Sequence, residues 1–286
     1  MAVYKRTYKT YSGPRTVPWS RFLILTRYSY SRLFQSKFLV LFMTAGLFYP
    51  VACLAFIYFS HNKPLLALLT LGNARFPTVD GKFFYTFSKV QGSFAYLLVA
   101  LVGPGLISPD LANGAMPLYF SRPFSRTEYV AGKLSLLVFL LSLITWVPGL
   151  VLYVVQASLE GWSWTKDNMW LGGAIFAGLL LWIVILALIA LACSAWVKWK
   201  IAAGALVLAI FFAGAGFGAA VNNVLRTHYG GLINLNQIIY TIWGALFRYD
   251  WGAELSLGQA WLVLALTCGA CVWLLAKRIR PLEVIK

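Results

Sequence analysis

Residues 171–196 read LGGAIFAGLLLWIVILALIALACSAW, a run of 26 residues without a charged side chain. A helix needs about 20 consecutive, mostly apolar residues to cross the hydrocarbon core of a bilayer. The whole chain shares this character. Of its 286 residues, 60% are hydrophobic and 11% are charged, whereas a typical soluble domain has about 25% charged residues. The sequence therefore predicts an integral membrane protein built from helices.

Five further stretches have the length and apolarity of a membrane-spanning helix. Together with the quoted run, the predicted spans are Phe38–Phe59, Gln91–Ser108, Leu134–Val155, Leu171–Trp196, Ile201–Val221 and Leu257–Ala276. The second span is the shortest; an alternative start near Phe83 would make it longer, with a kink at Gly103-Pro104-Gly105. Pro50 and Pro148 predict kinks in the first and third spans. We expect one all-α transmembrane domain over residues 1–286, with 1–37 ahead of the bundle, six helices in 38–276 and a tail at 277–286.

Basic residues are concentrated on one side of the predicted bundle. The N-terminal segment, the second loop, the fourth loop and the C-terminal tail hold eight, three, two and four Lys or Arg, which is 17 of the 24 in the chain. Loops rich in Lys and Arg stay in the cytoplasm, so both termini are predicted to be cytoplasmic. The net charge of +16 would then face anionic lipid headgroups. We expect a membrane-surface role for this charge and no nucleic-acid partner.

Two further helices are predicted outside the spans. Thr16-Val17-Pro18-Trp19 offers an N-cap and a proline near the first helical position. The basic and aromatic residues that follow, to about Lys37, are typical of a helix lying at the cytoplasmic interface; an extension of the first span is the alternative. Residues 232–247, LINLNQIIYTIWGALF, repeat apolar residues at helical spacing. This short run predicts either a re-entrant or interfacial helix, or one that packs on the outer ends of the bundle.

The predicted spans contain no Asp, Glu, Lys, Arg or His. Ion-coupled transport and voltage sensing use ionisable residues within the membrane, so neither is expected. The chain also has no phosphate-binding glycine loop, nucleophile elbow or histidine-pair metal motif. We expect neither enzyme activity nor a bound cofactor or metal in this chain. A membrane-embedded enzyme would have to assemble its site from outer-loop residues: His61, Asp80, His228, Asp250 and Glu254.

The loop between the second and third spans carries its own helical signals. Ser108-Pro109-Asp110 has the cap, proline and acidic residue that open a helix, which we expect to run to about Tyr119. Arg122-Pro123 interrupts the chain, and Ser125-Arg126-Thr127-Glu128 is a capping box that starts the next helix. The loop is therefore predicted to form a helix, a turn and a capped helix. It is either a compact knob that docks a partner or an ordinary connection between spans.

The residues of this loop resemble those of ABC-2-type transporter permeases, the membrane subunits of ATP-binding cassette exporters. That family has an acidic residue and a glycine, then a Pro-x-Ser-Arg block and a Gly-Lys pair. Asp110, Gly114, the block FSRPFSR at 120–126 and Gly132-Lys133 lie in the corresponding places. The family usually has Glu and Thr where this chain has Asp110 and Ala115. The family's plan of an N-terminal interfacial helix, six spans, both ends inside and short helices before the last span also resembles the whole chain.

The resemblance implies that this loop contains a coupling helix docked on a separate ATPase subunit, which would hold the ATP and Mg. The chain would lie in a bacterial-type inner membrane, in contact with lipid and with a second copy or a related permease. A channel, scramblase or assembly scaffold without ATP coupling is the alternative. The candidate docking residues are Asp110, Leu111, Gly114, Met116, Leu118, Tyr119, Arg122, Arg126 and Glu128, with a second contact at Lys198, Trp199 and Lys200.

Overall fold

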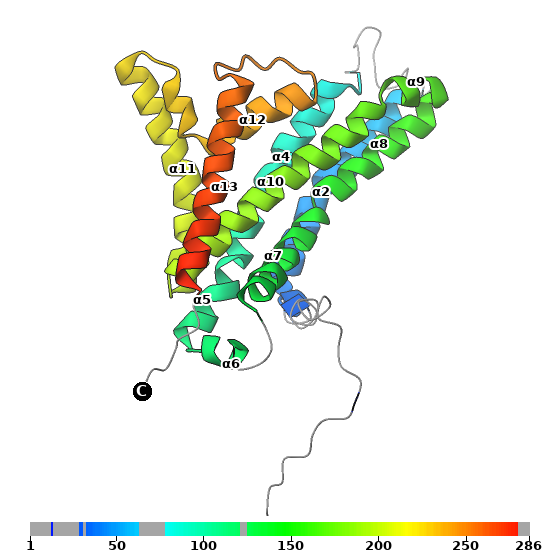
Figure 1. Cartoon of the computed structure of the whole chain (residues 1–286). Coiled ribbons are helices and arrows are strands. Elements are labelled where there is room, and N and C mark those ends of the chain that lie inside the picture. Colours follow the sequence, from blue (N-terminus) through cyan, green and yellow to red (C-terminus); the bar gives the residue numbers. More distant parts are fainter. Residues whose placement is uncertain (1–12, 14–28, 31–32, 63–77, 121–124, 280–286) are drawn as a thin grey trace, which may run out of the picture.

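Every secondary-structure element in the described part of the chain is helical. The computed structural model describes residues 13, 29–30, 33–62, 78–120 and 125–279, so most of the predicted interfacial helix over 16–37 and of the tail at 277–286 lies outside it. The helices, shown in Figure 1, are α2 (Lys37–His61), α4 (Gly81–Val102), α5 (Pro104–Ala112), α6 (Met116–Phe120), α7 (Arg126–Ser142), α8 (Trp146–Glu160), α9 (Trp162–Asp167), α10 (Met169–Trp196), α11 (Lys200–Leu225), η2 (Tyr229–Leu232), α12 (Leu235–Leu246) and α13 (Leu257–Arg278).

Six segments are long and apolar enough to span a membrane: α2, α4 with α5, α7 with α8, α10, α11 and α13. They follow the order of the six predicted spans. The second differs most, because α4 begins at Gly81, where the Asp80 carboxylate accepts a hydrogen bond from the Phe83 N–H at 3.2 Å. The earlier start is thus confirmed, and Lys82 and Lys89 belong to this helix. The predicted run Gln91–Ser108 has no ionisable residue, but the helix that contains it is longer, because the polar residues before Gln91 continue the same helix.

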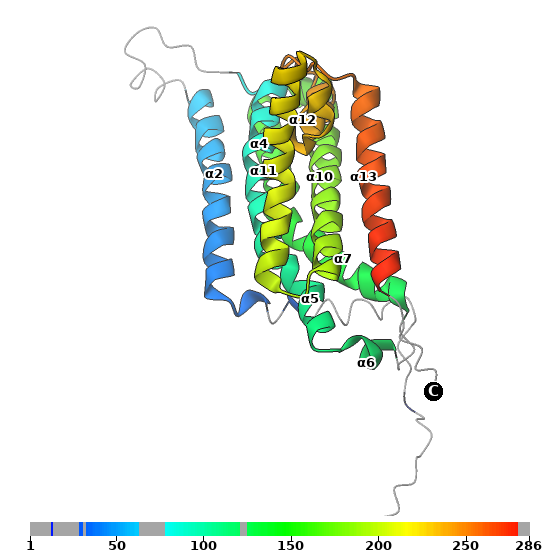
Figure 2. The same ribbon diagram turned by 90° about the vertical axis from the view of Figure 1, so that its left-hand side faces the viewer.

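Helix α10 lies at the centre of the bundle, as Figure 2 shows from the side. It has 28 residues and the highest mean hydropathy of the six segments, 3.0. It contacts α4, α5, α7, α8, α11, α12 and α13. A helix that is apolar on every side is expected where other helices surround it, and the uncharged run quoted above is therefore the core of the fold.

The three mid-span prolines have different effects. The second span bends at Gly103, just before Pro104, and the third is interrupted at residues 143–145, just before Pro148. Helix α2, in contrast, continues through Pro50. A proline removes the N–H that would bond the carbonyl four residues earlier, which here is Gly46 for Pro50 and Ile144 for Pro148.

One buried side chain bonds both of the carbonyls freed by Pro50 and Pro148. The side-chain amide nitrogen of Gln91, Nε2, donates to the Gly46 carbonyl at 2.8 Å and also to the Ile144 carbonyl. Gln91 is fully buried. Because Gly46 lies in α2 and Ile144 between α7 and α8, this amide of α4 joins three spans at one point.

The two ends of the bundle differ in charge. One end, called here the α6 end, carries the start of α2, the helices α5 and α6, and the end of α13; the opposite α12 end carries α9, η2 and α12 (Figure 1). Among the described residues, seven basic and two acidic side chains belong to the α6 end, and five of each to the α12 end. The α6-end residues are Lys37, Arg126, Lys133, Lys198, Lys200, Lys277 and Arg278, with Asp110 and Glu128.

The predicted helix in residues 232–247 is α12. It buries Ile238, Ile239, Ile242 and Trp243 and contacts α4, α10, α11 and α13. Its apolar face is thus covered by the bundle, as the packing alternative predicted. The segment ahead of it packs on α11 through a glycine: a Cβ at Gly218 would lie 2.4 Å from the Gly230 carbonyl oxygen.

Candidate functional site

The candidate site is the knob formed by α5, α6 and the start of α7 at the α6 end. Two buried serines hold α5 against α10. Ser194 Oγ accepts from the N–H groups of Ile107 and Ser108, at 3.1 and 2.9 Å, and donates to the Pro104 carbonyl at 2.9 Å. Ser108 Oγ lies 2.7 Å from the Val197 carbonyl and 2.9 Å from the Ser194 carbonyl. These bonds fix α5 to the central helix and to the residue that follows it, Val197.

The chain turns from α5 to α6 at Gly114. Gly114 has a φ of +63°, a conformation that costs other residues free energy. The Ala115 N–H donates to the Asp110 carbonyl at 2.8 Å and the Gly114 N–H to the Leu111 carbonyl at 3.4 Å, which together form a Schellman cap. The prediction of one helix from Asp110 to Tyr119 was therefore wrong. The helix starts earlier, at Pro104, and a glycine cap separates it from α6.

Asp110 faces α7 of its own chain. Its Oδ2 lies 3.1 Å from Lys133 Nζ and accepts a hydrogen bond from the Tyr129 hydroxyl at 2.6 Å. The side chains of Lys133 and Asp110 are only 8% and 19% exposed. The Lys133 ammonium also lies 5.4 Å from the centre of the Tyr129 ring. We call Asp110, Tyr129 and Lys133 the brace, because they tie α5 to α7 in a partly desolvated setting.

Helix α6 lies beside the brace. Its Tyr119 ring centre is 5.3 Å from that of Tyr129, and Met116 is buried. Burial, with a smaller contribution from the Asp110 carboxylate, raises the pKa of Tyr119. Tyr119 therefore remains neutral at physiological pH, and uncharged contacts hold α6 against the start of α7.

The capping box predicted at the start of α7 is confirmed. Ser125 Oγ accepts from the Glu128 N–H at 3.2 Å, and Glu128 Oε2 accepts from the Ser125 N–H at 2.6 Å. Glu128 thus fixes the first turn of α7, while the neighbouring Arg126 is exposed. Arg122 lies outside the described residues.

The knob and the predicted second contact are adjacent. A Cβ at Gly105 of α5 would lie 3.2 Å from Lys200 Cε at the start of α11, and α5 contacts α11. The large apolar side chains exposed at this end include Leu118 at 73%, Trp199 at 80% and Ile201 at 87%.

The predicted docking residues therefore divide into two groups. Asp110, Gly114, Met116, Tyr119 and Glu128 shape and fix the knob from within, and Leu111 is half-buried. On its exposed surface lie Leu118 and Arg126, and beside it are the exposed residues Lys198, Trp199 and Lys200. Ser108, which was predicted to be an N-cap, lies inside α5 instead, where the N-cap is Gly103; no role was predicted for Tyr129 or Ser194. Ser194 could have been singled out from the sequence because it is a polar residue in an otherwise apolar span, where a polar group needs a hydrogen-bonding partner.

The outer-loop residues that an enzyme would need do not form one site. His61 Nε2 lies 3.1 Å from Glu160 Oε1, and His228 Nδ1 lies 3.0 Å from Glu254 Oε2. Asp80 caps α4, and Asp250 accepts from the Gly252 N–H. Among the described residues, no three His, Cys, Asp or Glu side chains are grouped so that they could hold a metal ion.

Comparison with known proteins gives no assignment, because no protein-family model and no curated protein sequence matches this chain.

Proposed function

We propose that this chain is the membrane-spanning subunit of an ABC exporter, with ATP hydrolysed by a separate subunit docked on the knob. The chain itself would carry no ATPase domain, metal or cofactor; ATP and Mg would bind to the partner. Two copies, or one copy and a related permease, would form the path for the substrate in a bacterial-type inner membrane. The resemblance of the 110–133 segment to such permeases supports this function.

The observation that carries the proposal is the rigid attachment of the knob to three spans. Helix α5 continues the second span through the bend at Gly103, Ser194 fixes α5 to the fourth span, and the brace fixes it to the third. A displacement of α5 would therefore move three spans together, as expected for an element that transmits motion from a docked subunit to the membrane helices. An ordinary connection between two spans needs neither buried serines nor a largely buried ion pair.

The exposed surface of the knob fits a protein partner. Leu118 and Trp199 present apolar area at a basic end of the molecule, with Arg126 and Lys198 close by in sequence. Exposed apolar side chains rimmed by charge are typical of protein interfaces. The excess of basic side chains at this end favours a cytoplasmic position, where ATP is available. In the proposed cycle, the two ATPase subunits close on bound nucleotide and move the knobs of the two permease copies toward each other. This movement changes the side of the membrane to which the substrate path opens.

The test is purification of the tagged full-length chain from its native membranes, followed by an assay of vanadate-sensitive ATP hydrolysis. Wild type is compared with Leu118→Glu and Arg126→Glu, which change exposed positions of the knob. Lys166→Glu, in α9 at the opposite end, is the matched charge-changing control. We expect an ATPase subunit to co-purify with wild type and with Lys166→Glu, and to be lost or uncoupled in both knob variants.

Two outcomes would contradict the proposal. One is a preparation of folded wild-type chain that contains no ATPase. The other is ATP hydrolysis that the knob variants and the control affect equally. Either result would favour a channel, scramblase or scaffold and would leave the knob as a well-capped connection.

A further inference from the structure

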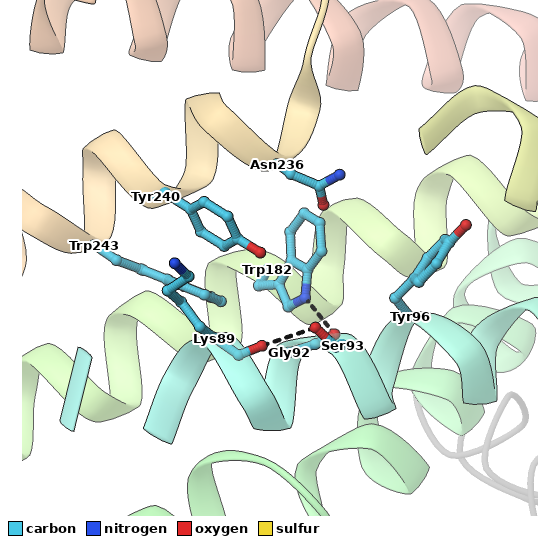
Figure 3. Close-up of a pocket in the computed structure, with 8 residues that line it drawn as sticks. All are labelled: Lys89, Gly92, Ser93, Tyr96, Trp182, Asn236, Tyr240 and Trp243. Atoms are coloured by element: carbon cyan, nitrogen blue, oxygen red, sulfur yellow. Dashed lines mark hydrogen bonds between the residues drawn. The ribbon is translucent and has the colours of Figure 1, made fainter. Parts of the chain in front are cut away.

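A second candidate site lies at the α12 end, away from the knob. A narrow cleft there, with about 20 Å³ of free volume, lies between α4, α10 and α12 (Figure 3). Its lining residues are Lys89, Gly92, Ser93, Tyr96, Trp182, Asn236, Tyr240 and Trp243.

The walls of this cleft are fixed by two indole rings. Trp182 Nε1 donates to the Gly92 carbonyl at 3.0 Å, and Trp243 Nε1 donates to the Gly178 carbonyl at 2.9 Å. Both glycines are required for these contacts. A Cβ at Gly92 would lie 2.8 Å from the Trp243 ring, and one at Gly178 would lie 3.1 Å from it. These hydrogen bonds and close contacts thus fix the walls of the cleft.

Of the described residues that line the cleft, only Lys89 is charged. Its ammonium lies 4.7 Å from the ring centre of Tyr240 and 5.6 Å from that of Tyr85. Within the described residues, no carboxylate lies within ion-pair distance of it. Contact with two aromatic faces offsets only part of the cost of placing a charge beside apolar helices. The site therefore has an uncompensated positive charge.

Further donors lie around Lys89. The Asn236 amide and the Tyr240 hydroxyl line the cleft and make no hydrogen bond with another described side chain or backbone group, and the buried Tyr85 hydroxyl has no partner in that part of the chain either. Figure 3 shows Lys89 and Tyr240 on the same side of the cleft, with Asn236 above Trp182. A cation with neutral donors and without an acid selects an anionic oxygen group such as a phosphate.

The depth of Lys89 matches the headgroup region of a bilayer. The uncharged apolar run of the second span begins at Gln91. Lys89 lies two residues before Gln91, or about 3 Å along the straight part of α4. It therefore lies close to the boundary of the hydrocarbon core, where a lysine reaches the headgroups.

An apolar surface continues from the cleft. The Tyr96 ring in its lining is 6.1 Å from Phe212 of α11, which is 68% exposed. An acyl chain could lie along this surface while the phosphate of its headgroup lies at the mouth of the cleft, beside the Lys89 ammonium. We propose that the Lys89 cleft binds the phosphate-bearing headgroup of an anionic amphiphile. This site would work whether or not an ATPase docks on the knob.

The proposal is tested by titrating the purified full-length chain in neutral detergent and following its thermal unfolding, since a ligand that binds the folded state raises Tm. The probes are short-chain phosphatidylglycerol, short-chain phosphatidylcholine and inorganic phosphate. The variants are Lys89→Met, Lys89→Arg, and Lys82→Met as the matched control. Lys82 is exposed on the same helix and also lies over a tyrosine ring, that of Tyr249, at 5.8 Å.

We expect phosphatidylglycerol to raise the Tm of wild type, Lys89→Arg and Lys82→Met alike, and its Kd to be at least tenfold weaker for Lys89→Met. Phosphatidylcholine should give a clearly smaller shift. If inorganic phosphate competes with phosphatidylglycerol at similar concentrations, the oxyanion site stands but its ligand is a free anion and not a lipid. Equal binding by wild type and Lys89→Met, or equal losses for Lys89→Met and Lys82→Met, would overturn the proposal. If Lys89→Met does not fold, Asn236→Val, which removes a neutral donor, should weaken binding severalfold; unchanged binding would count against the site.

Discussion

Replacing Gln91 by leucine should weaken the whole bundle, although Gln91 touches no proposed ligand or partner. The substitution keeps a similar volume and removes the two donated hydrogen bonds, to Gly46 and Ile144. Hydrogen bonds between membrane helices contribute about 0.6 kcal/mol on average and at most about 1.7 kcal/mol, so the free energy of unfolding should fall by about 1 to 3 kcal/mol. SDS titration of the purified chain, followed by circular dichroism, measures this change.

A double-mutant cycle with Pro50→Ala tests the reasoning directly. Alanine at position 50 restores the N–H that can bond the Gly46 carbonyl within α2. In that background, Gln91→Leu leaves only the Ile144 carbonyl without its partner, and its cost should fall to about half. Thr86→Ala is the control on the same helix, because its exposed hydroxyl donates to the Lys82 carbonyl of its own helix. The reasoning is refuted if Gln91→Leu costs no more than Thr86→Ala, or costs the same with and without Pro50.

Three further substitutions test the knob, each by SDS titration against wild type. Lys133→Met leaves the Asp110 carboxylate, which is only 19% exposed, without its cation and should cost about 1 to 3 kcal/mol, with a clear recovery when Asp110→Asn is added; no recovery would count against the brace. Gly114→Ala should cost about 1 to 2 kcal/mol because of the positive φ alone, since nothing lies within 4 Å of a Cβ there; a neutral result would mean that the turn relaxes. Ser194→Ala removes the bonds to α5 and should cost about 1 to 3 kcal/mol, with faster amide exchange confined to 104–112; unchanged exchange would separate Ser194 from α5.

The sequence determined the features that depend on neighbours along the chain. Apolar length fixed the number and order of the spans, since a bilayer-crossing helix satisfies its own backbone hydrogen bonds. The Ser125–Glu128 capping box was also predictable, because both of its hydrogen bonds close within three residues. The start of the second span was left open between Gln91 and the neighbourhood of Phe83, because the helix continues through the polar residues before Gln91 and the apolar run alone could not decide between them.

Only the tertiary structure decided which distant groups meet. Gly46 and Ile144 lie 45 and 53 residues from Gln91 in sequence, and Ser194 lies 86 residues from Ser108. The sequence showed that Pro50 and Pro148 each leave a carbonyl without its helical donor. It could not show that one amide serves both carbonyls, because that depends on how α2, α4 and α8 pack. The same holds in part for Lys89: Tyr85 is its neighbour one turn earlier on α4, but the Tyr240 ring is supplied by the packing of α12 on α4 and α10.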